Sequence, residues 1–306
     1  MLSILIPIYK QDATKLVQEL LDQCEAEGID YLISVYDDKS TKKWRQINSP
    51  LHHIFKVNYV ELSENLGRAK IRNWLAAAAP HDYLLYLDGD TGIISDSFIK
   101  KYVAVAGKYD VVSGGRTYTK KPTRSKKRRL HWKYGLHVES QPASVRNKKP
   151  ALYFHSNNFM VKAEVMSKVK FDEEHTGYGY EDILFGESLI DAGYTIHHIN
   201  NETLHTGLET TVDFLAKSKE AVHNLVKLQH NGKIGPTKLS TYYHKLERYG
   251  MASLIPAIYK LASSRITKSL HAESPNLKYF QLQKLMWYFQ FDKQMKASST
   301  DVRSSL

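Results

Sequence analysis

Two aspartates stand one residue apart directly after an apolar stretch, in the segment YLLYLDGDTG from Tyr83 to Gly92. Burying an unpaired carboxylate costs several kcal/mol, so Asp88 and Asp90 must lie in a solvated turn or face a positive group. Gly89 between them would let the backbone bend until both carboxylates face one cation. Carboxylate oxygens suit Mg²⁺ or Mn²⁺, which keep open positions for substrate phosphates. We therefore predict a divalent metal site here, with a solvated turn as the alternative.

A second acidic pair, Asp37 and Asp38, ends the apolar segment YLISVYDD. Taken alone, DDKST is good turn chemistry or a helix N-cap. In open α/β sheets, however, ligands bind beyond the carboxyl ends of the strands. The expected strand ends carry Pro7 and Tyr9, Asp37 and Asp38, and Asp88 and Asp90. Acids at two such ends favour a binding site over a simple turn.

A third pair, Glu181 and Asp182, follows two glycines in the segment GYGYED. The glycines suit a tight, ligand-facing loop that leads into a helix, where a carboxylate could act as a base. The alternative is that both acids complement the helix dipole. The first turn of a helix also stabilises a carboxylate as the anion, which makes it a weaker base, unless partial burial raises the pKa of the carboxyl.

The elements that must position these acids alternate between strand and helix over the first 115 residues. Apolar runs predict strands at residues 2–9, 31–38, 83–88 and 110–115, and helical spacing predicts helices at residues 14–28, 67–79 and 97–107. This alternation predicts an α/β fold with a single doubly wound, mostly parallel sheet flanked by helices.

The pattern changes from residue 116 onward. We expect a long basic loop at residues 116–135, strands at 153–162 and 195–200, and a glycine-rich loop followed by a helix that ends at Gly193. The predicted main domain covers residues 1–210 and divides at about residue 115. Residues 211–306 are expected to form a helical C-terminal extension with a polar tail at 297–306.

The composition narrows the class of protein. The 306 residues carry a net charge of +11, which implies an anionic partner. The single cysteine, Cys24, excludes intramolecular disulfides and cysteine-based metal clusters, so we expect a cytoplasmic protein. No apolar run reaches the length of a membrane span. The basic residues 120–133 are either a solvated loop or a peripheral contact with the inner face of an acidic membrane. The aromatic stretch 278–296 is either a packed helix or a second contact of that kind.

Several motifs in order resemble the family 2 glycosyltransferases, which have the GT-A fold and are inverting, metal-dependent and dependent on nucleotide sugars. The resemblance covers about the first two-thirds of the chain. It implies that residues 1–210 are the catalytic domain, with a nucleotide-sugar half at about 1–115 and an acceptor half at about 116–210. It rests on LSILIPIYK, VYDDKS (with Lys39 where the family usually has glycine), ENLGRAKIRNWL, YLDGDT, and the segment from SNNFMVK to the Glu181-Asp182 pair.

The resemblance implies roles for particular residues. Asp37 or Asp38 would contact uracil, and Arg72 could neutralise phosphate. The expected nucleotide-sugar contacts are Pro7, Tyr9, Asp37, Asp38, Asn65, Gly67, Arg68, Arg72 and Asp88. The expected ligands of Mn²⁺ or Mg²⁺ are Asp90 first, then Asp88, and His205 just after the last strand. Asp182 is the expected catalytic base and Glu181 the holder of an acceptor hydroxyl, although these two roles could be exchanged. We expect acceptor contacts from Asn157, Asn158, Trp132 and Tyr180.

The predicted function is inverting transfer of a sugar from a nucleotide diphosphate sugar, expected to be UDP-linked, to a hydroxyl of a glycan or lipid-linked acceptor. One alternative is a nucleotidyltransferase, but no glycine- and lysine-rich phosphate loop lies near the first strand. Another is a basic nucleic-acid-binding protein. No recognition module supports that alternative, and it leaves the acidic pairs unexplained, so no nucleic-acid partner is expected.

Overall fold

The computed structural model describes residues 1–175 and 177–304, with residues 299–304 described as helical backbone only. The chain divides into two compact units. The sheet unit comprises Met1–Tyr118, Val138–His175 and Glu181–Gly207, and the helical unit comprises Thr119–His137, Thr176–Tyr180 and Leu208–Leu306. These units are not the predicted domains, whose boundaries at residues 115 and 210 stay predictions.

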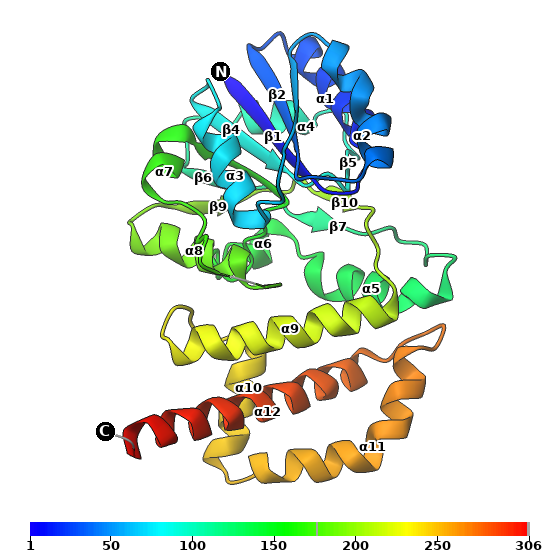
Figure 1. Cartoon of the computed structure of the whole chain (residues 1–306), viewed down its shortest axis with the longest axis vertical. Helices are drawn as coiled ribbons and strands as arrows, with labels where there is room; N and C mark the ends of the chain where they lie inside the picture. Colours follow the sequence, from blue (N-terminus) through cyan, green and yellow to red (C-terminus); the bar gives the residue numbers. More distant parts are fainter. Residues whose placement is uncertain (176, 305–306) are drawn as a thin grey trace. The chain divides into compact units, whose positions relative to one another are not determined.

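A seven-stranded sheet forms the centre of the sheet unit (Figure 1). Its strand order is β3-β2-β1-β4-β8-β6-β9, and only β8 runs antiparallel to its neighbours. The strands are β1 (Leu2–Ile8), β2 (Tyr31–Asp37), β3 (Val57–Glu61), β4 (Tyr83–Leu87), β6 (Val111–Ser113), β8 (Asn158–Lys162) and β9 (Ile196–His198). The predicted mostly parallel sheet flanked by helices is confirmed.

The sheet is apolar on both faces because its strands alternate between two cores. In β1, Ile4 and Ile6 belong to one core while Leu5 belongs to the other, as the twofold period of a strand requires. The first core is covered by α1 (Thr14–Ala26) and α4 (Phe98–Val103). The second is covered by α3 (Arg68–Ala77), α7 (Ala163–Lys168) and α8 (Glu181–Asp191).

A second, three-stranded sheet was not predicted. It has the order β5-β10-β7 and consists of β5 (Thr91–Gly92), β7 (Arg116–Thr117) and β10 (Thr203–His205). Strands of two or three residues are too short to leave a periodic pattern in a sequence. This sheet matters for function because β5 begins directly after Asp90 and β10 ends at His205.

Other elements depart from the expected boundaries. The basic segment expected to be a loop contains helical turns, and β3 was not anticipated. The remaining helices of the first 150 residues are α2 (Lys42–Asn48), η1 (Ser49–His53), η2 (Lys126–Arg128), α5 (Arg129–Tyr134), η3 (Gly135–Glu139) and α6 (Ala143–Arg146). The strand expected at residues 153–162 begins only at Asn158.

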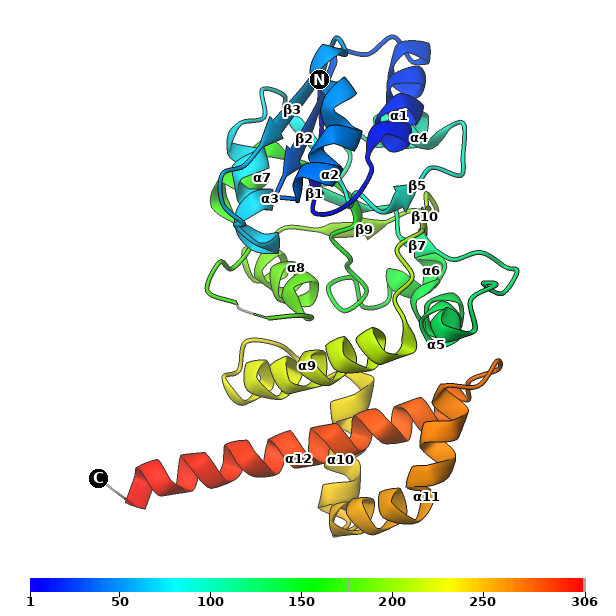
Figure 2. The ribbon, with the colours of Figure 1, turned by 45° about the vertical axis from the view of Figure 1, so that its right-hand side comes forward.

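The C-terminal region is helical, as predicted. It contains α9 (Thr211–His230), α10 (Lys238–Arg248), η4 (Ala252–Leu254), α11 (Ile255–Leu270) and α12 (Leu277–Ser304). In Figures 1 and 2, α12 lies between α9 and α11. Phe280, Trp287 and Tyr288 of α12 are buried, which favours the packed-helix interpretation of this aromatic stretch. Of the expected polar tail, residues 305 and 306 lie outside the described residues.

No helix in the described part of the chain combines the length and apolarity needed to cross a membrane.

Candidate active site

The turn after β4 carries the two aspartates singled out in the sequence. The Asp88 amide donates to the carbonyl of Asn157 (3.2 Å), and the Asp88 carbonyl accepts from the Thr91 amide (3.1 Å). Gly89 is needed here for close approach, not for the bend that we expected, because its φ is not left-handed. A Cβ at this position would lie 2.6 Å from the Ile8 side chain, closer than carbon atoms pack.

The small sheet brings Asp90 and His205 together. Antiparallel pairing of β5 with β10 sets His205 opposite Thr91, and His205 Nδ1 lies 3.4 Å from Asp90 Oδ2. The Asp90 carbonyl accepts from both the amide (2.9 Å) and the hydroxyl (2.7 Å) of Thr206. Gly207 leaves room for the carboxylate, since a Cβ there would lie 2.1 Å from Asp90 Oδ2.

The surrounding charges favour the ionised form of Asp90. Burial raises the pKa of this carboxyl, but the hydrogen bond and charge of His205, with the charges of Arg116 and Arg68, lower it further, so the net pKa lies below its usual value. A carboxylate oxygen beside an imidazole nitrogen is a donor set that Mn²⁺ accepts. The residues present therefore fit a divalent cation at Asp90 and His205.

Asp88 bonds to a buried arginine. Arg72 Nη2 donates to Asp88 Oδ1 at 2.7 Å, while Nη1 donates to the Arg68 carbonyl at 3.2 Å. The Arg72 side chain is only 3% exposed and stacks over Phe171 at 5.6 Å. The Arg72 guanidinium therefore bonds to Asp88 inside the protein, and its expected contact with phosphate stays a prediction. Within the described residues no three His, Cys, Asp or Glu side chains surround one point.

The Glu181-Asp182 pair opens α8, as the sequence suggested. Glu181 Oε1 accepts from Arg68 Nη1 at 3.0 Å. Asp182 Oδ2 lies 3.9 Å from His155 Nδ1, and Asp182 Oδ1 is buried without a hydrogen-bond partner. Burial raises the Asp182 pKa, but His155 and the charge of Arg72 lower it more, so the carboxyl is ionised well below the usual range. Asp182 thus offers a charged oxygen that has no hydrogen-bond partner among the residues that the structure describes.

Asp37 and Asp38 brace the loops that follow β2 and β3. Asp37 is fully buried, and its Oδ1 accepts from the Ser40 amide at 2.6 Å. Asp38 accepts from the Leu66 amide (2.6 Å, Oδ1) and the Gly67 amide (3.0 Å, Oδ2). Burial raises the pKa of Asp38, while these two amides lower it in part, and the net pKa is raised. Both acids therefore hold backbone in place, whatever else they contact.

The remaining expected nucleotide contacts surround these loops. Asn65 Nδ2 donates to the Asp38 carbonyl at 2.8 Å, and Gly67 has a φ of 79°, which suits glycine. Tyr9 is exposed and Pro7 is half-buried on the same edge of the sheet. These positions place the Asn65–Gly67 loop beside the ends of β1 and β2.

The expected acceptor contacts fall in both units. Asn158 is fully buried, accepts from the Tyr102 hydroxyl (2.6 Å) and donates to two carbonyls, so its amide is bonded within the fold, and its expected contact with an acceptor stays a prediction. Asn157 accepts from Arg116 Nε at 3.2 Å. Trp132 and Tyr180 belong to the helical unit, and Trp132 Nε1 donates to the Thr119 carbonyl at 2.8 Å.

Sequence reasoning missed a cluster behind His205. Arg116 Nη1 lies 3.4 Å from Glu139 Oε2, which also accepts from the Tyr118 hydroxyl at 2.5 Å. The Tyr118 ring meets the His205 ring edge-on at 5.4 Å. Burial lowers the Arg116 pKa, but Glu139 and other acids outweigh it and raise the pKa. An arginine on a two-residue strand gives no local signal in the sequence.

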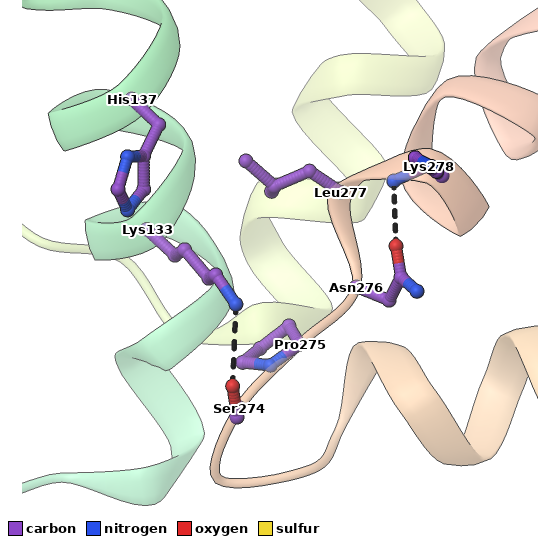
Figure 3. Close-up of a pocket in the computed structure, with 7 residues that line it drawn as sticks. All are labelled: Lys133, His137, Ser274, Pro275, Asn276, Leu277 and Lys278. Carbon is purple, nitrogen blue, oxygen red and sulfur yellow. Dashed lines mark hydrogen bonds between the residues drawn. The ribbon is translucent and has the colours of Figure 1, made fainter.

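A separate pocket lies in the helical unit (Figure 3). Its volume is about 450 Å³, and Lys133 Nζ donates to Ser274 Oγ at 3.2 Å beside it. The lining residues are Lys133, His137, Ser274, Pro275, Asn276, Leu277 and Lys278. They include no carboxylate, so this pocket offers little to a metal cation.

Acidic side chains follow the carboxyl ends of β2 and β4 in this mostly parallel sheet, and open α/β proteins bind their ligands at that edge. Residues 3–170 match the sequence profile of Glycosyl transferase family 2. Because this match spans more than half of the chain, the protein belongs to Glycosyl transferase family 2 and is a nucleotide-sugar transferase. No curated protein sequence matches it significantly.

Solved structures share the fold at low sequence identity. The mannosyltransferase PcManGT from Pyrobaculum calidifontis, in complex with GDP-Man and Mn²⁺, is 14% identical with a TM-score of 0.57, covering 95% of this chain and 85% of its own. Glucosyl-3-phosphoglycerate synthase from Mycobacterium tuberculosis, with Mn²⁺, UDP and glucosyl-3-phosphoglycerate, is 16% identical with a TM-score of 0.50, covering 74% and 79%. TarS from S. aureus with UDP-GlcNAc is 16% identical with a TM-score of 0.49, covering 97% and 92%.

Proposed function

We propose that this chain is a metal-dependent, inverting glycosyltransferase that uses a UDP-linked sugar and a glycan or lipid-linked acceptor hydroxyl. The observation that carries the proposal is the pairing of two acidic sites on one sheet unit. Asp90 lies against His205, and Asp182 presents a buried oxygen that has no hydrogen-bond partner. A cytoplasmic location stays a prediction.

The nucleotide would bind over the ends of β1 and β2. Asp37 and Asp38 brace this edge, the exposed Tyr9 is available to contact the base, and the Asn65–Gly67 loop would close beside the ribose. PcManGT and glucosyl-3-phosphoglycerate synthase, which share this fold, have been solved with GDP-Man and with UDP respectively, each with Mn²⁺. Arg68 is exposed and could approach the diphosphate.

Asp90 and His205 would hold Mn²⁺ or Mg²⁺, with Asp88 as a further ligand if it leaves Arg72. A bound divalent cation neutralises charge that grows on the departing diphosphate. The protein contributes the geometry: Thr206 fixes the Asp90 carbonyl, and Arg72 orients Asp88 when it is not a ligand.

Asp182 would accept the proton of the acceptor hydroxyl. As that oxygen attacks the anomeric carbon, the bond from this carbon to the diphosphate oxygen breaks, and its electron pair leaves with the diphosphate. A carboxylate of low pKa is a weak base for a free hydroxyl, but the attacking oxygen becomes strongly acidic as its new bond forms. Glu181, oriented by Arg68, would hold the acceptor.

The test is Asp182→Asn in a transfer assay, after nucleotide sugars have been screened for thermal stabilisation in Mn²⁺. We expect turnover to fall by about 10² to 10⁴, the usual contribution of a general base, with the fold retained by circular dichroism. The matched control is Asp191→Asn, at the exposed end of the same helix, which should keep wild-type turnover. Glu181→Gln tests the exchanged assignment. Wild-type turnover in both Asp182→Asn and Glu181→Gln would refute the mechanism.

A further inference from the structure

Helix α11 in the helical unit carries apolar side chains on a buried face and also on an exposed face. Its buried face includes Ile255, Ile266 and Leu270. The exposed face carries Ile258 and Leu261, which are 51% and 86% exposed, and continues from Leu254 of η4, which is 51% exposed. Residues spaced by three and four share one side of a helix, so these three side chains form a single exposed stripe. One apolar face is enough to pack a helix, and the second is unexplained by the fold.

The stripe is part of a larger concentration. Of the twelve exposed large apolar side chains in the described part of the chain, six lie between residues 242 and 261. They are Tyr242, Tyr249, Met251, Leu254, Ile258 and Leu261. Single exposed apolar residues are ordinary on a protein surface, whereas a concentration of them marks an interaction site.

The same segment is strongly basic. Residues 238–271 contain six lysines and arginines and a single acid, Glu247. Arg265 and Lys268 are exposed and follow Leu261 by four and seven residues, so they continue the apolar stripe along the same side of α11. An apolar stripe that runs into cations is the pattern of a helix lying in the interface of an anionic membrane.

We propose that the exposed face of η4 and α11, together with Arg265 and Lys268, docks on an anionic phospholipid surface. Apolar side chains would enter the acyl boundary, and the cations would meet lipid phosphates, each adding affinity within a Debye length of the surface. A second copy of the chain is the less suitable occupant, because it would bring two basic surfaces together. This surface differs from the α12 stretch considered in the sequence, whose Phe280, Trp287 and Tyr288 are buried.

The experiment is co-sedimentation of the full chain with vesicles of phosphatidylglycerol and phosphatidylcholine, compared with pure phosphatidylcholine. We expect the wild type to bind the anionic vesicles and to lose affinity at high salt. The double variant Ile258→Ser/Leu261→Ser should bind at least tenfold more weakly. Arg265→Gln/Lys268→Gln should also lose at least tenfold, since one cation near such a surface is worth about fivefold.

Two control variants distinguish binding through this surface from nonspecific apolar binding and from nonspecific electrostatic binding. Phe55→Ser removes an equally exposed apolar side chain of the sheet unit, 84% exposed, and Lys168→Gln/Lys170→Gln removes two exposed cations there. Both should bind like the wild type.

The proposal is overturned if the wild type does not bind anionic vesicles, if the α11 variants bind as tightly as the wild type, or if the controls lose as much affinity as the α11 variants. It is also overturned if sedimentation equilibrium shows a wild-type oligomer that the α11 variants abolish. No readout depends on sugar transfer, so failure here and failure of the proposed function are distinguishable.

Discussion

Lowering the pH should destabilise the sheet unit through one buried histidine, His198. Arg146 Nη1 lies 2.6 Å from His198 Nδ1, and His198 Nε2 lies 3.0 Å from the Pro150 carbonyl. Since arginine only donates, Nδ1 must accept and Nε2 must carry the proton that goes to the carbonyl. A second proton on Nδ1 would remove the acceptor of this hydrogen bond and set a charged imidazolium against the guanidinium of Arg146. Burial first, and the charge of Arg146 next, lower the His198 pKa from 6.5 to about 4.

The sign and the size of the effect follow from linkage. Because the folded pKa lies below the unfolded value, the unfolded chain binds more protons between about pH 6.5 and about pH 4, so stability falls as the pH falls through this window. For pKa values of 6.5 and about 4, the loss between pH 7 and pH 5 is about 2 kcal/mol, and by pH 4 it reaches about 3 kcal/mol.

The measurement is the free energy of unfolding in urea at several pH values for the wild type and for His198→Gln. The variant is expected to be less stable at pH 7, because it disturbs a buried hydrogen-bond pair, but its stability should fall by about 2 kcal/mol less between pH 7 and pH 5. Replacing an exposed histidine in His53→Gln should leave the wild-type pH dependence. Equal pH dependence in the wild type and His198→Gln would refute the reasoning.

Two further predictions concern backbone positions beside the site. Gly207→Ala should lower turnover at least tenfold while the protein stays folded. The reason is that the new methyl group would lie 2.1 Å from Asp90 Oδ2 and displace that carboxylate. Unchanged turnover together with unchanged Mn²⁺ affinity by calorimetry would contradict this prediction. Lys39 has a left-handed φ of 60°, which glycine adopts without the steric cost that lysine incurs. Lys39→Gly should therefore raise the free energy of unfolding in urea by about 0.5 to 1 kcal/mol, which is the relieved steric cost minus the extra conformational entropy that glycine loses on folding. The exposed helical Lys15→Gly should instead destabilise by about 1 kcal/mol, and equal effects at both positions would exclude backbone conformation as the cause.

The parts of the fold that could be predicted from sequence are those with a strong local pattern. The seven residues of β1 form one apolar run, and α1 follows with its apolar residues on one side, so both were anticipated to within one or two residues. Gly67 and the acids after β2 and β4 were likewise placed by local chemistry. The acid pairs could be found because charge next to a buried strand is rare.

The rest depends on contacts between distant parts of the chain. Nothing near Arg72 in the sequence shows that this helical arginine is buried and bonds to Asp88. Asn158 could not be recognised as structural without its partners Tyr102 and Asn201. The small sheet pairs β5 with β10 across more than a hundred residues, and pairing of that kind leaves no trace in a short window of sequence.

Carboxylates outnumber guanidiniums at the candidate site, and this imbalance is a reason for expecting a divalent cation there. The carboxylates there are Asp88, Asp90, Glu139, Glu181 and Asp182, and the guanidiniums that meet them are Arg68, Arg72 and Arg116. Five carboxylates against three guanidiniums leave a deficit of two positive charges, with His155 and His205 as neutral or charged neighbours. Each arginine is already committed to a carboxylate: Arg68 to Glu181, Arg72 to Asp88 and Arg116 to Glu139. Asp90 and Asp182 each have only a histidine within ion-pair distance among the described residues, His205 and His155 respectively, so the excess negative charge that a divalent cation would offset lies on these two carboxylates.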